Sequence, residues 1–265
     1  MANDTVTATL IGGPTTLLEV AGLRLLTDPT FDPPGAFSSG PVTLTKLVGP
    51  AMTPEAVGIV DAVLLSHDQH PDNLDPAGRA FLSTVPHVFT TDVGARRLAD
   101  PKDSYGRIEG LAPWQTRDLV TPHGYTVHVT ATPARHGPAG IEPLTGEVIG
   151  FVLTFDDQRD HAIYITGDTV WYEGVADVAR RFEVSIVLAF VGAAQTRGPV
   201  SLTMTTDDAI ETARAFPHAT IVPVHHQGWA HFTQNQDDLT RAFAAVGLTS
   251  RLHLLEPGVA TSLVR

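Results

Sequence analysis

The segment LLSHDQHPDNLD, residues 64–75, carries two histidines and three aspartates directly after an apolar run. An ordinary polar loop that leaves a strand can have this composition, so the segment alone does not establish a metal site. Imidazole and carboxylate groups are, however, ligands of zinc, manganese and iron. His67, His70 and Asp72 lie within six residues, and this clustering favours a metal-binding loop.

Three further segments share its layout, because each is an apolar run that ends in His or Asp beside a small or turn residue. They are TATPARHGP (130–138), YITGDTVW (164–171) and IVPVHHQGW (221–229). Sites in sheet proteins tend to form where strands end and loops converge. The candidate ligands are therefore His67, His70, Asp72, His136, Asp168 and His225.

The composition limits the kind of partner. The chain has 265 residues, of which 43% are hydrophobic and 17% charged, with a net charge of −12 and no cysteine. The acidic balance argues against nucleic acid and anionic membranes, and the missing cysteines exclude thiolate sites and Cys nucleophiles. We expect a small-molecule substrate, and a homo-oligomer stays open. The start of the sequence lacks signal-peptide features, so a cytoplasmic location is the default expectation.

The hydrophobic pattern predicts an α/β fold in one domain over residues 1–265. Strands alternate with helices, and two mixed sheets packed face to face with helices outside would account for this order. We expect a Pro- and Gly-rich loop at 29–40 and helices at 76–84, 174–182, 205–216 and 233–247. The expected strands are 5–11, 15–21, 23–28, 61–66, 87–91, 125–134, 148–155, 162–168, 184–190, 220–226, 251–257 and 260–265.

The ordered segments resemble the metallo-β-lactamase-fold hydrolases, in the branch that includes ascorbate-6-phosphate lactonase-like proteins. The resemblance covers nearly the whole chain. It starts at LLEVAGLRLLTDPTFDPP (17–34), where the family has a hairpin that ends in an Asp-Pro turn, and continues through LLSHDQHPDNLD, ATPARHG, YITGDT and VPVHHQGW. It implies an αββα sandwich that holds one or two divalent ions, zinc or manganese, with iron as a further option.

The resemblance also implies roles for the metal loop. His67 matches the first histidine of the family's H-x-H-x-D-H motif. His70, Asp72 and Asn73 match its second histidine, aspartate and third histidine if one residue is inserted after His67. An ungapped alignment would instead place Gln69 and Pro71 on ligand positions, and proline has no group to offer. Asn73 stands where the family has a histidine, and an amide oxygen is a weaker donor toward zinc-like ions.

The remaining metal roles follow in the same way. His136 would complete the first metal position, Asp168 would bridge two metals, and His225 would join Asp72 at the second. Asp28 resembles a carboxylate that orients a ligand imidazole from behind.

The implied reaction is hydrolysis of an ester, lactone, amide or phosphoester by a metal-activated water that Asp72 orients. His226 and His231 are candidates for contacting the substrate or donating a proton, or else are structural. Two tryptophans that follow proposed ligands, Trp171 and Trp229, would line the pocket or belong to the core.

Two other classes of protein stay open. The first is a binding or regulatory protein whose metal site has degenerated, which the substitution at Asn73 motivates. The second is a two-iron redox enzyme, which would need a flavin partner. No G-x-S-x-G turn and no phosphate-binding P-loop is found in the sequence.

Overall fold

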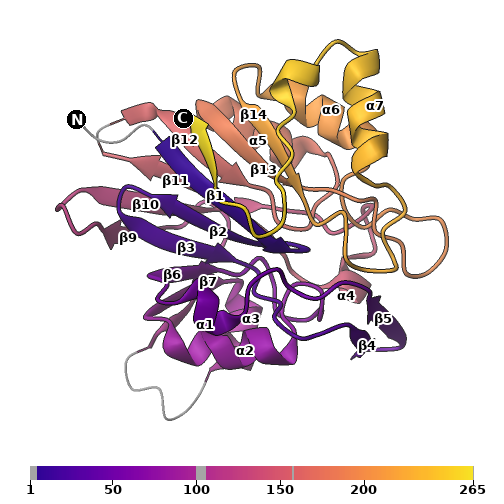
Figure 1. Ribbon diagram of the computed structural model, residues 1–265, viewed down its shortest axis with the longest axis horizontal. Helices are drawn as coiled ribbons and strands as arrows, with labels where there is room; N and C mark the ends of the chain where they lie inside the picture. Colours follow the sequence, from indigo (N-terminus) through magenta and orange to yellow (C-terminus); the bar gives the residue numbers. More distant parts are fainter. Residues whose placement is uncertain (1–4, 100–105, 157, 265) are drawn as a thin grey trace.

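Two β-sheets pack face to face in the computed structural model, which describes residues 5–99, 106–156 and 158–264 (Figure 1). The first sheet is mixed, with an antiparallel half from β15 to β3 and a parallel half from β3 to β8. Its strand order is β15 (Thr261–Val264), β1 (Thr5–Gly12), β2 (Thr15–Val20), β3 (Leu23–Thr27), β6 (Ala62–Leu64), β7 (His87–Thr90) and β8 (Ile108–Gly110).

The second sheet is also mixed. Its strands β14, β13 and β12 run parallel, and β12 to β9 form an antiparallel meander. The order is β14 (Thr220–Val224), β13 (Val184–Phe190), β12 (Gln158–Ile165), β11 (Ile149–Phe155), β10 (Thr126–Pro133) and β9 (Thr116–Val120).

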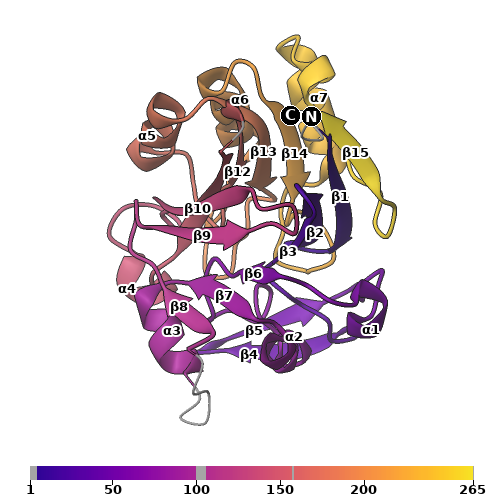
Figure 2. The same cartoon turned by 90° about the vertical axis from the view of Figure 1, so that its left-hand side faces the viewer.

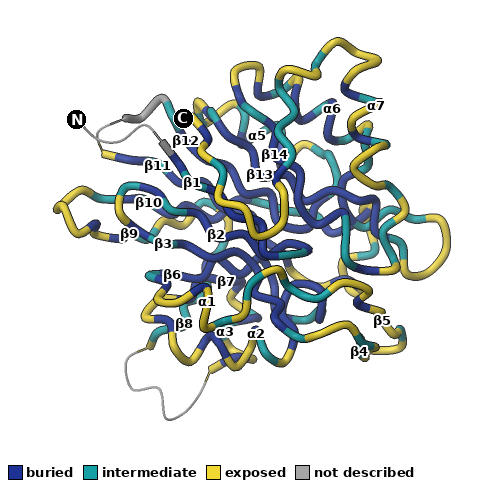
Figure 3. Tube along the Cα trace, viewed as in Figure 1, coloured by how far each residue is buried: buried dark blue, intermediate teal, exposed yellow. Residues whose placement is uncertain are grey.

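The main core lies between the sheets, because alternate residues of each strand point inward. In β12, Ile163 and Ile165 face the first sheet, whereas Ala162 and Tyr164 belong to the core on the opposite face. The central strands are therefore buried on both faces, as Figure 3 shows. This burial explains why their sequences are continuous apolar runs.

Helices cover both outer faces of the sandwich (Figure 2). The first sheet is covered by α1 (Pro54–Val57), α2 (Pro76–Phe81) and α3 (Asp92–Leu98), and the second by α5 (Glu173–Arg181), α6 (Thr206–Ala215) and α7 (Gln236–Ala245). The cap of α6 follows from its sequence, because Thr205 and Asp208 form a reciprocal capping box. None of the described helices is long and apolar enough to cross a membrane.

The structure corrects two sequence predictions. The predicted loop at 29–40 contains a strand, β4 (Gly35–Ser39), which pairs with β5 (Val42–Lys46) as a separate hairpin. The predicted strand at 251–257 instead starts in a 3₁₀ turn, η2 (Thr249–Arg251), and makes only the isolated bridge between Leu252 and Ile221. Its apolar residues pack without forming a ladder, which a hydrophobic pattern does not distinguish from a strand.

A buried ion pair fastens the base of the β4–β5 hairpin. The Nζ of Lys46 lies 3.0 Å from Oδ2 of Asp75, and the two side chains are 4% and 0% exposed. Asp75 also accepts hydrogen bonds from the backbone N–H groups of Phe31, Asp32 and Gly78, the last as the N-cap of α2. The carboxylate is thus fully used in structure, and the hairpin is held against α2.

Candidate metal centre

The candidate ligands come from the ends of strands in both sheets. Residues 67–73 follow β6 of the first sheet, whereas His136, Asp168 and His225 follow β10, β12 and β14 of the second. Two residues at these ends have a left-handed backbone, Asp28 with φ of 33° and His225 with φ of 57°. Non-glycine residues hold such conformations only where the surroundings fix them, and these positions cluster at functional sites.

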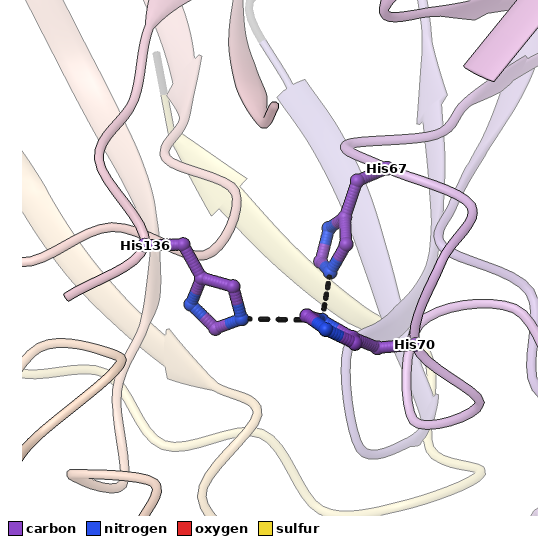
Figure 4. A group of neighbouring side chains, drawn as sticks. All are labelled: His67, His70 and His136. Atoms are coloured by element: carbon purple, nitrogen blue, oxygen red, sulfur yellow. Dashed lines mark hydrogen bonds between the residues drawn. The ribbon is translucent and has the colours of Figure 1, made fainter. Parts of the chain in front are cut away.

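Three histidines form the first group, and Figure 4 shows their imidazole rings turned toward one another. The Nδ1 of His70 lies 2.9 Å from Nε2 of His67 and 3.2 Å from Nε2 of His136. Burial, reinforced by His70, lowers the pKa of His67, and burial with His136 lowers the pKa of His70 to about 4. Both rings are therefore neutral at pH 7, which is the form that binds a metal.

The second group joins Asp72, Asp168 and His225, all buried. The Nδ1 of His225 lies 3.0 Å from Oδ1 of Asp168, and its Nε2 lies 3.4 Å from Oδ2 of Asp72. Burial opposes ionisation of both carboxyls, but the nearby histidines hold the pKa of each below its usual value. The two carboxylates are therefore charged at neutral pH.

Asp168 lies between the two groups. Its Oδ2 is 3.6 Å from Nε2 of His136, while its Oδ1 faces His225. This is the placement that the resemblance implies for a bridging ligand.

Asn73 is fully buried beside the second group, and its amide nitrogen donates to Oδ1 of Asp168 at 3.4 Å. In this orientation the side chain supports the aspartate, and its Oδ1 has no hydrogen-bond partner among the described residues.

Ser66 links Asp28 to the first group. Its hydroxyl donates to Oδ1 of Asp28 at 2.7 Å and lies 2.9 Å from Nδ1 of His67. Asp28 is fully buried, and burial raises its pKa. The expected carboxylate behind a ligand imidazole is thus present, but it reaches the ring through a serine that the sequence did not single out. His136 is oriented in a similar way, because its Nδ1 lies 2.8 Å from the carbonyl oxygen of Leu202.

The two residues between His67 and His70 make their side-chain contacts outside the two ligand groups. The buried Asp68 forms an ion pair with Arg97 of α3, whose side chain is 44% exposed. Gln69 donates to the carbonyl oxygens of Thr145 and Glu147. His67 and His70 therefore share one group, which agrees with the gapped alignment.

The residues present fit a divalent cation. Each group offers three ligand atoms that lie within 4.8 Å of one another. Oδ1 of Asp72 and both ring nitrogens of His225 are buried and make no directed hydrogen bond within the described part of the chain. Buried polar atoms without partners are costly, whereas a cation placed among them would satisfy these lone pairs and offset the two carboxylates.

A cavity of about 220 Å³ opens above the centre and has His70, Asp72, His136 and His231 in its wall. The Nε2 of His231 lies 3.0 Å from Oδ2 of Asp72, so this candidate catalytic histidine faces the centre. His226 does not line the cavity, because it is buried near Gly192 and only 4% exposed. Its position gives no support to contact with a substrate.

The two tryptophans lie elsewhere. Trp171 packs against the core under α5 and α6, and Trp229 is buried beside Lys46 and Phe37. Neither lines the cavity over the centre.

Two helix-covered mixed sheets, with His and Asp at the strand ends of both, define a protein of the metallo-β-lactamase fold. Residues 23–226 match the family model described as a beta-lactamase superfamily domain, and the chain belongs to this family.

Individual proteins show the same relationship. The chain is 26% identical over 261 residues to YddR of Bacillus subtilis, covering 94% of this chain and 97% of that protein. It is 27% identical over 213 residues to a metal-dependent hydrolase of Myxococcus xanthus, covering 80% and 71% of the two chains. Among solved structures, an isothiocyanate hydrolase from Delia radicum gut bacteria superposes with a TM-score of 0.80 at 24% identity, covering 98% and 100%. A metallo hydrolase from Ignicoccus hospitalis gives 0.71 at 18% identity, covering 98% and 99%.

Proposed function

We propose that this chain is a metal-dependent hydrolase that cleaves an ester, lactone, amide or phosphoester bond of a small molecule. The observation that carries the proposal is the convergence of six His and Asp side chains beside a cavity whose other walls are largely apolar. The names of the relatives, several of which are called metal-dependent hydrolases, support the same class.

The ligand set suits zinc or manganese, with iron as a further option, because it combines imidazole with carboxylate and has no thiolate. His67, His70 and His136 would hold one ion, and Asp72, His225 and the shared Asp168 a second. When bound, the metal supplies Lewis acidity, which polarises a substrate oxygen and lowers the pKa of water toward neutrality.

The chain itself supplies a proton donor and its support. His231 stands in the cavity wall with Nε2 toward the centre, and Asp72 fixes the ring through the 3.0 Å contact. The proton on Nε2, which His231 donates to Asp72 in this structure, would transfer to a leaving group bound above the centre, so His231 is the proposed general acid. Asp72 thus serves both the second metal position and the orientation of His231.

The test begins with metal-free protein loaded separately with Zn²⁺, Mn²⁺ or Fe²⁺. Each form is assayed on small esters, lactones, amides, phosphoesters and an alkyl isothiocyanate, which the name of one structural neighbour suggests. Turnover that depends on the metal supports the proposal. Tight metal binding with no turnover on the whole panel would instead support a binding or regulatory protein.

The role of His231 is tested by His231→Gln. We expect kcat to fall about 10²- to 10⁴-fold, the usual contribution of a general acid, with metal content unchanged. The exposed His123 gives the control variant His123→Gln, which should retain wild-type kcat. Loss of metal in His231→Gln would make His231 a ligand instead of an acid.

A further inference from the structure

The cavity over the candidate metal centre has two unlike ends. Its polar end is formed by the His and Asp residues of the centre, whereas most of the remaining wall is aliphatic: Val42, Leu44, Ile141, Leu144, Val200 and Leu202. Apart from the residues of the centre, Arg197 is the one charged side chain that the described residues place in this wall, and it is exposed. A substrate that fills the cavity therefore places an uncharged apolar group against aliphatic side chains.

Part of this aliphatic wall is a short segment around α4 (Glu142–Thr145), which contributes Ile141, Leu144 and Thr145. The segment is a single helical turn, and its own hydrogen bonds among the described residues are local, between positions 138 and 146. One turn of helix is not stable by itself, so its position depends on contacts with the rest of the molecule.

Gln69 supplies such a contact. Its amide nitrogen donates to the carbonyl oxygens of Thr145 at 2.9 Å and Glu147 at 3.1 Å, and its Oε1 accepts from Arg97 at 2.8 Å. The approach is close, because a Cβ at Gly146 would lie 2.5 Å from Nε2 of Gln69, and Gly146 has φ of +79°. The α4 segment is thus tied to the loop that carries His67 and His70.

We propose that Gln69 is a positioning residue that fixes the α4 wall of the cavity, and that this wall selects substrates with an uncharged apolar group beside the hydrolysed bond. The inference rests on the proposed function for its catalytic consequence. Gln69, one of the two residues between His67 and His70, thereby influences substrate selection without contacting the substrate.

The first test measures binding without hydrolysis. Acetamide, butanamide and hexanamide are titrated into metal-loaded protein by calorimetry. Each methylene that the wall buries should strengthen binding about fourfold until the cavity is full, the factor that corresponds to burial of one CH₂. In Gln69→Ala the increase in affinity for each added methylene should fall below about twofold, with metal content unchanged. Gln69→Glu keeps the size and the contact with Arg97 but has no amide to donate to the two carbonyls, and it should behave like Gln69→Ala.

The second test compares p-nitrophenyl acetate with p-nitrophenyl hexanoate. We expect Gln69→Ala to raise KM for the hexanoate about tenfold, while kcat for the acetate stays within about twofold. The matched control is Gln115→Ala, because the Gln115 side chain is exposed and, among the described residues, accepts from the backbone N–H of Ala112 alone. Ile141→Asp should weaken binding of hexanamide and leave acetamide unaffected, which tests the wall independently of Gln69.

The outcomes separate the two proposals. If both Gln69 variants keep the wild-type dependence on chain length, or if Gln69→Glu keeps it while Gln69→Ala loses it, the role of the amide is overturned. Hydrolysis without any dependence on chain length would overturn the selectivity and leave the hydrolase standing. Binding that depends on chain length, without turnover on any substrate, would overturn the proposed hydrolase function and leave the selectivity of the cavity wall standing.

Discussion

The hydroxyl of Ser66 links Asp28 to His67. It donates to Oδ1 of Asp28 at 2.7 Å and lies 2.9 Å from Nδ1 of His67. When Nε2 of His67 faces the centre, Nδ1 carries the proton and donates to Ser66. The buried carboxylate thus fixes both the tautomer and the orientation of the ring through an intermediate group.

Removing this hydroxyl should weaken metal binding while leaving all proposed ligands in place. For Ser66→Ala we expect affinity for the metal to fall about 10- to 100-fold, as for other groups that support a ligand from behind. Competition with a chromophoric chelator measures the affinity. Ser83→Ala is the matched control, because the Ser83 hydroxyl lies on an exposed turn and donates to the carbonyl oxygen of Ala80, its one partner in the described part of the chain. Equal affinities for the two variants would show that the hydroxyl does not act on the metal.

The ligand positions themselves should differ in importance. His136→Ala removes a member of the first group and Asp168→Ala a member of the second, and Asp168 also faces the first. We expect each variant to lower metal affinity by more than about 100-fold, which exceeds the loss typical of a residue that only supports a ligand. Asn73→Ala should lower it less, because the Asn73 amide donates to Asp168. Elemental analysis after dialysis gives the metal content. Full occupancy in both main variants would contradict the assigned centre.

Lys46 should be important for stability. Lys46→Met leaves the buried carboxylate of Asp75 with only its backbone donors, and breaking a buried pair on one side costs about 3 to 5 kcal/mol. We expect the free energy of unfolding, measured in urea, to decrease by an amount near the lower end of this range. Arg241→Met, which breaks an exposed pair with Asp238, should cost less than about 1 kcal/mol. A loss as small for Lys46→Met would mean that the pair does not anchor the hairpin.

A histidine on the outer face of β10 should make stability depend on pH. Hydrogen bonds that His128 donates to the carboxylates of Asp118 and then Asp156 raise its pKa above the usual value. Its contribution is therefore fully present below the unfolded pKa of about 6.5 and is lost as pH rises through the folded pKa. The pair is partly exposed, so His128→Gln should lower Tm by only about 1 to 3 °C at pH 5.5.

At pH 9, which lies above the unfolded pKa, the difference between the variant and the wild type should be smaller than at pH 5.5, because the stabilising contribution of His128 is lost as pH rises through the raised folded pKa. Thermal unfolding of metal-free protein measures the difference, and His123→Gln again serves as control. A larger effect at pH 9 than at pH 5.5 would reverse the expected sign and exclude the ion pair as its cause.

Much of the sandwich could be predicted from the sequence, because its strands are apolar runs bounded by Gly, Pro and Asp, and α6 and α7 begin with capping boxes. The β4–β5 hairpin could not, since its short strands carry few large apolar residues and lie outside the main core, although their burial alternates. The predicted strand at 251–257 was wrong because its apolar residues pack without a β-ladder, and apolar packing does not require one.

The six candidate ligands were singled out because each lies in a short segment that follows an apolar strand. The roles of Ser66 and Gln69 were missed, because each depends on a partner that is distant in sequence: Asp28 for one, and Thr145 and Glu147 for the other. A serine before a histidine and a glutamine after an aspartate carry no local signal of such contacts. His226 was singled out with His231 as a candidate for contacting substrate, but it follows the left-handed turn at His225 and is buried outside the cavity wall.

The ligands of the centre are supplied by both sheets, from His67 in the first to His225 in the second, in a chain that has no cysteine. A metal held by both would act as a cross-link between segments more than 150 residues apart, and closing so long a loop removes much entropy from any partly unfolded chain. Loss of the metal should therefore loosen the seam between the sheets before it disturbs either one, so protease cleavage of metal-depleted protein should begin in the loops between them.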